Sequence, residues 1–142
     1  MKTLRRLLAS FFAGLALAGC AGTNVAPSGY TNAADFRTCL LTVGKGELGS
    51  INEGALKALE DGKKRLGVAV RADTVKSADK IEEAIKRDIS ANCSLIVGVG
   101  EAFVSQVMNQ SKYHRSRHFA LLLPPGSKAQ ASRDNVAVVS YD

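Results

Sequence analysis

Three glycines near the start of the sequence have a spacing that can serve phosphate chemistry. Gly44, Gly46 and Gly49 read G-x-G-x-x-G, the pattern that lets backbone N–H groups approach a dinucleotide pyrophosphate. Such a site needs the helix to open within the glycines and an acidic residue at the end of the next strand. Here a helix start at Ser50 follows the third glycine, and Arg71 occupies the expected strand end. We therefore expect no nicotinamide or flavin cofactor.

The other residues able to do chemistry do not form a recognisable set. His114 and His118 have the spacing of metal ligands on a helix, but they lie in a polar loop with no third ligand nearby in sequence. Glu47 and Glu101 occupy two turns that can face each other, and paired carboxylates can act as acid and base. No nucleophile accompanies them, so contacts to a polar ligand or a solvated surface fit better. We expect no metal site, no cofactor, no catalytic residue and therefore no enzyme.

The first 19 residues have the pattern of an export signal. A basic segment, residues 1–6, precedes an apolar segment, residues 7–18, that is too short to span a bilayer. The ending L-A-G-C resembles the lipobox of bacterial lipoproteins, in which the Cys is diacylated and becomes the first residue of the mature protein. An ordinary signal peptide with a chance Cys is the alternative. We predict lipidation at Cys20 and a lipid anchor on the extracytoplasmic face of the cell membrane.

Composition and charge favour one folded domain behind this anchor. The sequence has 142 residues, of which 46% are hydrophobic, and this suits a single packed core. Removing residues 1–19 lowers the net charge from +6 to +3, which gives no indication of a nucleic-acid partner. Residues 20–34 are polar and lack periodicity, so we predict a flexible tether there. Residues 35–142 are predicted to form a single α/β domain.

Strand and helix patterns alternate along this domain. The expected strands are residues 37–43, 68–71, 94–98, 118–123 and 136–140. The expected helices start at Ser50, near Ser77 and at Glu101. The first has a capping box, S-x-x-E, and an inward face formed by Ile51, Ala55, Leu56, Leu59 and Leu66. This order predicts a doubly wound, mostly parallel sheet with strand order 2-1-3-4-5 and helices on both faces.

The predicted strand order brings two pairs of features together. Cys39 and Cys93 fall at the N-terminal ends of neighbouring strands, and an even pair in an oxidising compartment favours a disulfide over the alternative of two buried free thiols. The two glycine turns, residues 44–49 and 98–100, fall at the C-terminal ends of the same strands. That edge is the topological switch point, where open α/β sheets bind their ligands.

Most of the predicted domain resembles the basic membrane protein family. The matching segments are residues 35–41, 50–59, 66–68, 93–100, 119–123 and 135–137. The family comprises lipoprotein substrate-binding components of ABC importers with a type I periplasmic-binding-protein fold, and several members take purine nucleosides. The resemblance implies an ABC permease as partner and a nucleoside-like small molecule as ligand. It also implies that this chain supplies the N-terminal lobe of a two-lobed fold.

The resemblance, together with the facing turns, points to a set of ligand-binding residues. They are Thr42, Glu47, Ser50, Ile51, Asn52, Gly98, Gly100 and Glu101. Some differ from the family pattern: Thr42 stands where an Asp is usual, and Ile51 and Glu101 stand where aromatic residues are usual. A single lobe also offers only one wall of a cleft. We therefore keep a second hypothesis, a one-lobed envelope lipoprotein with a structural or protein-interaction role and no small-molecule ligand.

Overall fold

The protein is described by a computed structural model that covers residues 32–44 and 49–141. Its elements are η1 Ala33–Asp35, β1 Arg37–Val43, α1 Gly49–Leu66, β2 Ala69–Val75, η2 Ala78–Lys80, α2 Ile81–Ser90, β3 Leu95–Val99, η3 Glu101–Phe103, α3 Val104–Tyr113, β4 His118–Leu123 and β5 Val136–Ser140. In this part of the chain no helix has the length and apolar character needed to cross a membrane. The predicted signal peptide, Cys20 and Glu47 lie outside the described residues, as does most of the predicted tether.

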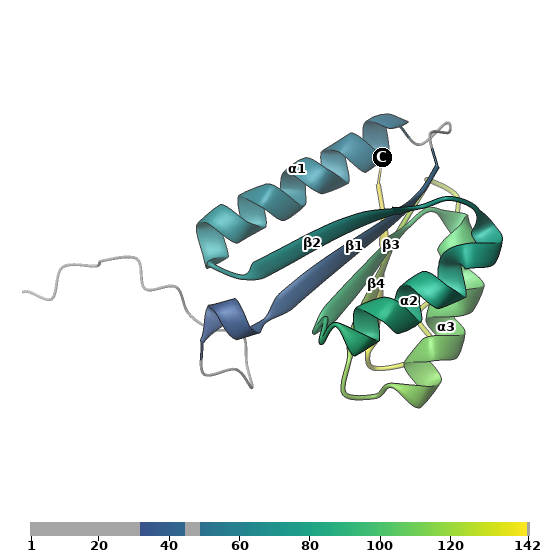
Figure 1. Cartoon of the computed structure of the whole chain (residues 1–142). Coiled ribbons are helices and arrows are strands. Elements are labelled where there is room, and N and C mark those ends of the chain that lie inside the picture. Colours follow the sequence, from purple (N-terminus) through teal and green to yellow (C-terminus); the bar gives the residue numbers. More distant parts are fainter. Residues whose placement is uncertain (1–31, 45–48, 142) are drawn as a thin grey trace, which may run out of the picture.

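The five strands form one sheet in the order β2-β1-β3-β4-β5, as the sequence predicts. Every neighbouring pair is parallel, so the sheet is more regular than the mostly parallel sheet that we expected. Helix α1 lies on one face of the sheet, and α2 and α3 lie on the other (Figure 1). Right-handed crossovers explain this, because the chain moves one way from β1 to β2 and the opposite way afterwards.

The main core lies between the sheet and the pair α2 and α3. Alternate side chains of the strands point to this face, and they pack with the apolar stripes of both helices. The fully buried members with the largest side chains are Phe103, Phe119, Leu41, Ile81, Ile85, Ile96, Leu121 and Leu123. Each fully buried large aliphatic or aromatic side chain contributes about 1.5–3 kcal/mol. This layer therefore supplies most of the apolar burial that holds the fold.

Strand β2 is longer than the sequence predicts. It runs over Ala69–Val75, whereas the apolar pattern ends at Arg71. Each residue of β1 has a partner in β2, from Arg37 opposite Ala69 to Val43 opposite Val75. Backbone pairing with β1 therefore extends the strand through a polar stretch that has no strand pattern of its own. As a result, Asp73 lies inside the strand and not beyond it.

Helix α1 differs from its prediction at its start and on its inner face. It begins at Gly49, so Ser50 lies in its first turn and does not cap it. Asn52 is its only buried residue, whereas Leu56 and Leu66 are 41% and 56% exposed. Two of the five predicted inward residues therefore face solvent, because in the described part of the chain α1 packs against the sheet alone and has no second helix beside it.

The third helix is also displaced along the chain. A 3-10 turn, Glu101–Phe103, precedes α3, and α3 continues to Tyr113. Lys112 is thus helical, and His118 is the first residue of β4. Gly100, at φ 101°, redirects the chain as it leaves β3, and the 3-10 turn connects this bend to α3.

One half of the α1 face of the sheet is not covered by any described helix. Helix α1 makes most of its contacts with β1 and β2, and fewer with β3. Apart from the buried Val99, the apolar side chains of β3, β4 and β5 on this face are half-buried or exposed. They are Leu95, Val97, Ala120, Leu122, Ala137 and Val139, which we call the open apolar face. At its edge Val139 is 48% exposed.

Candidate functional site

The carboxyl ends of β1 and β3 meet at one edge of the sheet, where the sequence predicts a ligand site. Gly44 and Gly100 leave these strands with φ angles of 51° and 101°, in the region that favours glycine. The Gly44 N–H donates to the Val75 carbonyl at 3.0 Å, and the Gly100 N–H donates to the Leu122 carbonyl at 2.8 Å. Gly44 and Gly100 are therefore each held by a neighbouring strand, which defines the backbone where β1 and β3 end.

Thr42 contributes a buried hydroxyl near this edge. It is 5% exposed and lies opposite Thr74 of β2. The two Oγ1 atoms are 3.2 Å apart and share one hydrogen bond. One hydroxyl donates to the other, so the accepting hydroxyl keeps its own proton for a further acceptor. The pair can therefore donate one hydrogen bond to a ligand, whereas the Asp of the family pattern could only accept.

Asn52 is the polar residue at this edge that most needs a partner. It lies in α1 close to the helix start and is 9% exposed. Its Oδ1 is buried and has no hydrogen-bond partner among the described residues. Leaving a buried carbonyl oxygen unpaired costs about 1–3 kcal/mol. A ligand or a water that donates to this oxygen would remove that cost.

The remaining predicted ligand residues at this edge differ in exposure. Ser50 and Glu101 are exposed, and Ile51 is half-buried. The structure therefore brings Thr42 and Asn52 to the edge as buried polar groups, with Ser50 and Glu101 available from solvent. Ligand binding by these residues stays a prediction.

Gly98 has a packing role that the sequence pattern does not reveal. A Cβ atom built on Gly98 would lie 2.7 Å from both Cβ and Cγ of Phe103, which is fully buried. The glycine therefore lets the Phe103 ring close over β3. This packing explains Gly98 without a ligand.

Replacing Gly98 by alanine is expected to destabilise the protein. The added methyl group must displace Phe103 or the β3 backbone, and overpacking of this kind costs about 1–3 kcal/mol. Urea unfolding of Gly98→Ala, compared with Gly54→Ala on α1, measures the effect. A Cβ on Gly54 meets no atom within 4 Å, so that control should not be destabilised. Equal stability of the two variants would contradict the packing role.

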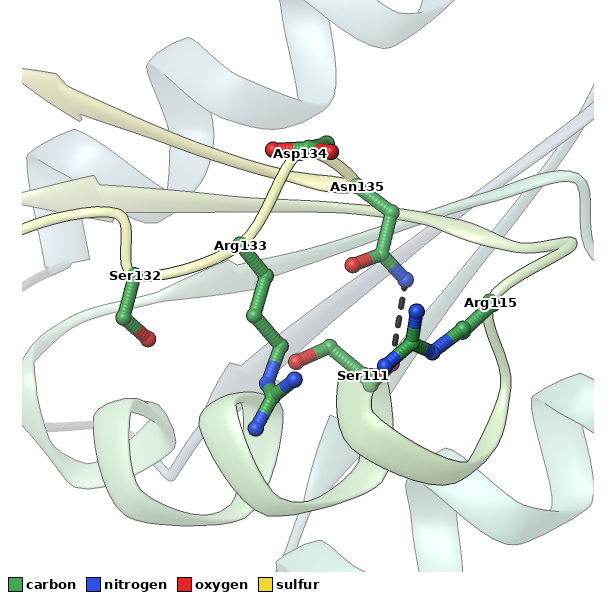
Figure 2. A pocket seen from close by; sticks show the side chains of 6 residues that line it. All are labelled: Ser111, Arg115, Ser132, Arg133, Asp134 and Asn135. Atoms are coloured by element: carbon green, nitrogen blue, oxygen red, sulfur yellow. Dashed lines mark hydrogen bonds between the residues drawn. The ribbon is translucent and has the colours of Figure 1, made fainter.

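A hollow of about 340 Å³ lies at the opposite edge of the sheet, away from the predicted site. It is lined by Ser111, Arg115, Ser132, Arg133, Asp134 and Asn135. Figure 2 shows both arginine side chains beside Ser111, with Asn135 hydrogen-bonded to the Ser111 carbonyl. The Asn135 Nδ2 also lies 3.2 Å from the His114 carbonyl and 3.0 Å from the Arg117 carbonyl. Asn135 thus fastens the loop before β4 to the start of β5, a structural role that explains its position.

A second hollow, of about 320 Å³, lies closer to the predicted site. It follows the end of β2 and the start of α2, and it is lined by Thr74, Val75, Lys76, Lys80, Glu83, Ala84 and Arg87. Thr74 lines it, but by strand alternation the Thr42 and Thr74 hydroxyls point to the α1 face, whereas Glu83, Ala84 and Arg87 place this hollow on the α2 face. The sequence does not predict the residues that line this hollow, because the apolar pattern of β2 ends at Arg71, four residues before the strand ends.

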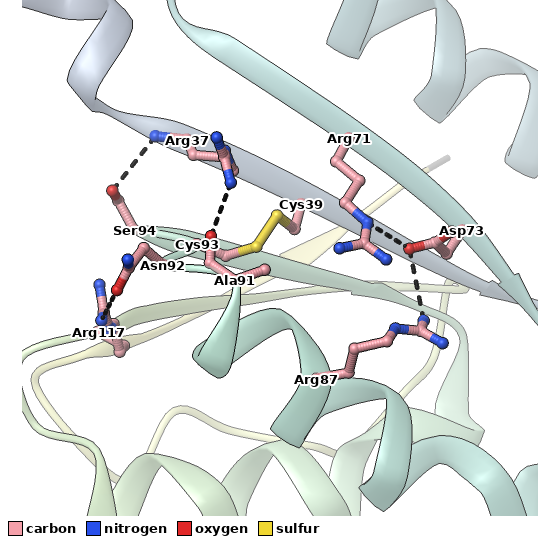
Figure 3. Close-up of a disulfide and its surroundings, with 10 residues drawn as sticks. All are labelled: Arg37, Cys39, Arg71, Asp73, Arg87, Ala91, Asn92, Cys93, Ser94 and Arg117. Carbon is pink, nitrogen blue, oxygen red and sulfur yellow. Dashed lines mark hydrogen bonds and ion pairs between the residues drawn. A yellow bond between two sulfur atoms is a disulfide. The ribbon is translucent and has the colours of Figure 1, made fainter.

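Cys39 and Cys93 form a disulfide, as the strand order predicts. Their Cα atoms are 5.9 Å apart, and both residues are fully buried. In Figure 3 the disulfide lies between Arg37 on one side and Arg71 and Arg87 on the other. On one side Arg37 donates to the Ala91 carbonyl at 2.7 Å. On the other, Arg71 pairs with Asp73 at 2.7 Å.

Asp88 lies against this disulfide. A carboxylate oxygen of Asp88 and the two sulfurs all lie within 4.8 Å of one another, the only such group of potential metal ligands among the described residues. Both sulfurs are engaged in the disulfide, so they cannot act as thiolate ligands in this state. Burial raises the pKa of Asp88 from 3.8 to about 6, although Arg71 and Arg87 act in the opposite direction. His114 and His118 do not join this group.

Comparison with solved structures finds the same architecture in binding proteins. A protein assigned as a lipoprotein from Peptoclostridium difficile 630, solved as a fragment, superposes with a TM-score of 0.67 and 19% identity, over 74% of this chain and 84% of that chain. An ABC transporter solute-binding protein from Aeropyrum pernix K1 gives a TM-score of 0.62 and 24% identity, over 72% of this chain and 28% of that one. The fold is that of one lobe of a solute-binding protein.

A third similar structure contains a ligand. The 5-methylthioribose transporter solute-binding protein from Thermotoga lettingae TMO, in complex with 5-methylthioribose, has a TM-score of 0.55 and 15% identity, over 77% of this chain and 33% of that chain. This chain therefore spans about a third of the length of the solute-binding proteins, but most of the length of the lipoprotein fragment. No protein-family model matches the sequence, and no curated protein matches it.

Proposed function

We propose that this protein is a membrane-anchored substrate-binding lipoprotein, or one lobe of such a protein, resembling the nucleoside-binding component of an ABC importer. The observation that carries the proposal is Asn52 at the switch point of the sheet, whose buried Oδ1 has no partner among residues 32–44 and 49–141. A polar atom in this state is suited to a ligand that donates a hydrogen bond. The lobe-like fold and the lipobox before Cys20 support the same role. Binding without catalysis, and without a cofactor, is part of the proposal.

The proposed ligand is a small molecule that carries a ribose. Sugar hydroxyls can donate to Asn52 and accept from the Thr42–Thr74 pair, so both groups at the edge would be satisfied. A structural neighbour holds 5-methylthioribose, a ribose derivative. Ile51 replaces the aromatic residue of the basic membrane protein pattern and offers no stacking ring. The proposed site therefore recognises the sugar more strongly than a base.

The proposed setting is the extracytoplasmic face of the cell membrane. The described chain enters β1 from Asn32, so an anchor at Cys20 would attach at the N-terminal edge of the sheet and leave the ligand edge facing away. One lobe provides only one wall of a cleft. A second wall, and an ABC permease as acceptor, complete the proposed role.

A thermal-shift titration tests ligand binding. Adenosine and 5-methylthioribose are each added at millimolar concentration to the mature chain. At about ten times Kd, binding stabilises the fold by about 1.4 kcal/mol and raises Tm by roughly 5–8 °C. Asn52→Ala should abolish the shift, whereas Asn109→Ala, on the exposed surface of α3, should retain it. No shift with either compound would exclude a ribose site on this lobe.

The open apolar face favours a second candidate function, a protein-interaction role without a small-molecule ligand. The six residues of this face have no charged member, so two copies can meet there without like-charge repulsion. The occupant that we assign in this case is a second copy of the chain. Sedimentation of a dimer that Val139→Glu converts to a monomer, together with no thermal shift, would favour this role over ligand binding. A monomer at all concentrations would exclude it.

A further inference from the structure

Asp88 is a buried acid with no partner that explains it. It is fully buried in the last turn of α2, and neither carboxylate oxygen has a hydrogen-bond partner among the described residues. A negative charge near a helix C-terminus also opposes the helix dipole. Buried acids without partners are rare and costly. In the disulfide-bonded structure, the Asp88 carboxylate therefore makes no hydrogen bond to a described residue that would stabilise the fold.

The disulfide beside Asp88 cannot supply a hydrogen-bond donor, but the reduced cysteines can. A thiol carries an S–H group that donates to a carboxylate, and this group is lost when the disulfide forms. An Asp88 oxygen and both sulfurs lie within 4.8 Å of one another, so the acid is positioned for the thiols. The Asp88 carboxylate can thus accept a hydrogen bond from a cysteine thiol only before the disulfide forms.

A backbone hydrogen bond links Asp88 to Cys93, one of the two cysteines. The Cys93 N–H donates to the backbone carbonyl of Asp88 at 3.0 Å, in the turn that ends α2. Cys39 comes from β1, 54 residues away in sequence. The Asp88–Cys93 arrangement therefore forms with α2 alone, and Cys39 joins it when β1 packs against β3.

We propose that Asp88 is the proton acceptor in the formation of the Cys39–Cys93 disulfide. An external disulfide of the RSSR class first reacts with the Cys39 thiol and gives a mixed disulfide and one RSH. The Cys93 thiol then transfers its proton to Asp88, and the Cys93 thiolate attacks the Cys39 sulfur. The bond between Cys39 and the RS group breaks, and the leaving thiolate takes the proton from Asp88. Two thiols are oxidised, and one RSSR is reduced to two RSH.

The charge of the buried cluster explains why an internal acceptor is needed. The thiolate is the nucleophile in disulfide exchange, and burial and the end of α2 both disfavour it at Cys93. Transfer of the proton to Asp88 keeps the cluster at a single negative charge. The charged groups that act on Asp88 are Arg71 and Asp73 from β2 and Arg87 from α2, and the two arginines offset part of this charge. With a pKa of about 6, Asp88 is an ionised base at neutral pH.

The test follows the closing step directly. The mature chain, reduced and refolded, is mixed with glutathione disulfide, quenched with acid and alkylated, and the species are separated by mass. In the wild type the mixed disulfide at Cys39 should be short-lived. In Asp88→Asn it should accumulate, because closure at pH 7 slows about 100-fold without the proton acceptor. Asp79→Asn, which removes an exposed carboxylate that is not among the charged groups acting on Asp88, should close at the wild-type rate.

Two outcomes would overturn the proposal. Closure of Asp88→Asn at the wild-type rate would show that solvent or another group takes the proton. The second outcome needs no variant and so does not depend on its folding. In the wild type the closure rate should level off once the pH exceeds the pKa of Asp88, which burial raises above its ordinary value. A rate that keeps rising tenfold per pH unit up to pH 8 would assign the base to hydroxide.

Discussion

Replacement of both Cys39 and Cys93 by alanine is expected to lower the free energy of unfolding by about 4 kcal/mol. The disulfide closes a loop of 54 residues, and in the chain-entropy account a loop of this length restricts the unfolded chain by about that amount. Both residues are fully buried in the core between the sheet and α2, so small cavities would add to the loss. Urea denaturation of the double variant and the oxidised wild type gives the difference.

Reduction provides the matched control. A thiol reductant should bring the wild type close to the stability of the double variant and should leave the variant unchanged. Alkylation before reduction should label neither Cys39 nor Cys93 in the native wild type. Labelling of both in the unreduced protein would show that the bond is absent, and equal stability of all three species would show that it does not support the fold.

The strand order, and with it this disulfide, could be derived from sequence. Patterns of alternating strands and helices restrict the topology strongly, because crossovers are right-handed and parallel strands need a connection across the sheet. Once β1 and β3 are neighbours, Cys39 and Cys93 must lie at the same end of adjacent strands. Asn92, which ends α2 at φ 59°, could also be derived from its residue type.

Features that depend on neighbours distant in sequence could not be derived. The polar half of β2 is a strand only because β1 pairs with it. Gly98 reads as a ligand-turn glycine in sequence, and only the position of Phe103 shows its packing role. Leu56 and Leu66 fit an inward helical stripe, but none of the described helices covers that side of α1. Periodicity predicts which residues share a face, and it does not predict what covers that face.

The candidate site also has features that the sequence predicts and features that depend on three-dimensional contacts. Thr42 and Asn52 could be placed at the switch point because strand order fixes that edge. Their burial, the Thr42–Thr74 hydrogen bond and the unpaired Asn52 oxygen needed three-dimensional contacts. Asp88 was part of a helix pattern with nothing to distinguish it from a solvated acid. It is the last turn of α2, packed on β1, that places it in the core.

Asp88 is expected to make the protein less stable as pH rises from 4 to 7. Its pKa is raised from 3.8 in the unfolded chain to about 6 in the fold, chiefly by burial. Between these values the folded state binds more protons than the unfolded state, so the free energy of unfolding falls with increasing pH. The loss is complete above about pH 6 and amounts to about 3 kcal/mol, because each pKa unit corresponds to about 1.4 kcal/mol.

The measurement is the difference in free energy of unfolding between the wild type and Asp88→Asn across this pH range. Asparagine keeps the shape of the side chain and does not titrate, so the contributions of other acids cancel in the difference. Asp79 provides the control, because its hydrogen bond from Ser77 lowers its pKa below 3.8. The stability due to Asp79 is lost only as pH falls below about 4, so the Asp79→Asn difference should stay nearly flat from pH 4 to 7. If the Asp88 difference is flat from pH 4 to 7, the carboxyl group is paired or solvated, and burial beside the disulfide does not raise its pKa.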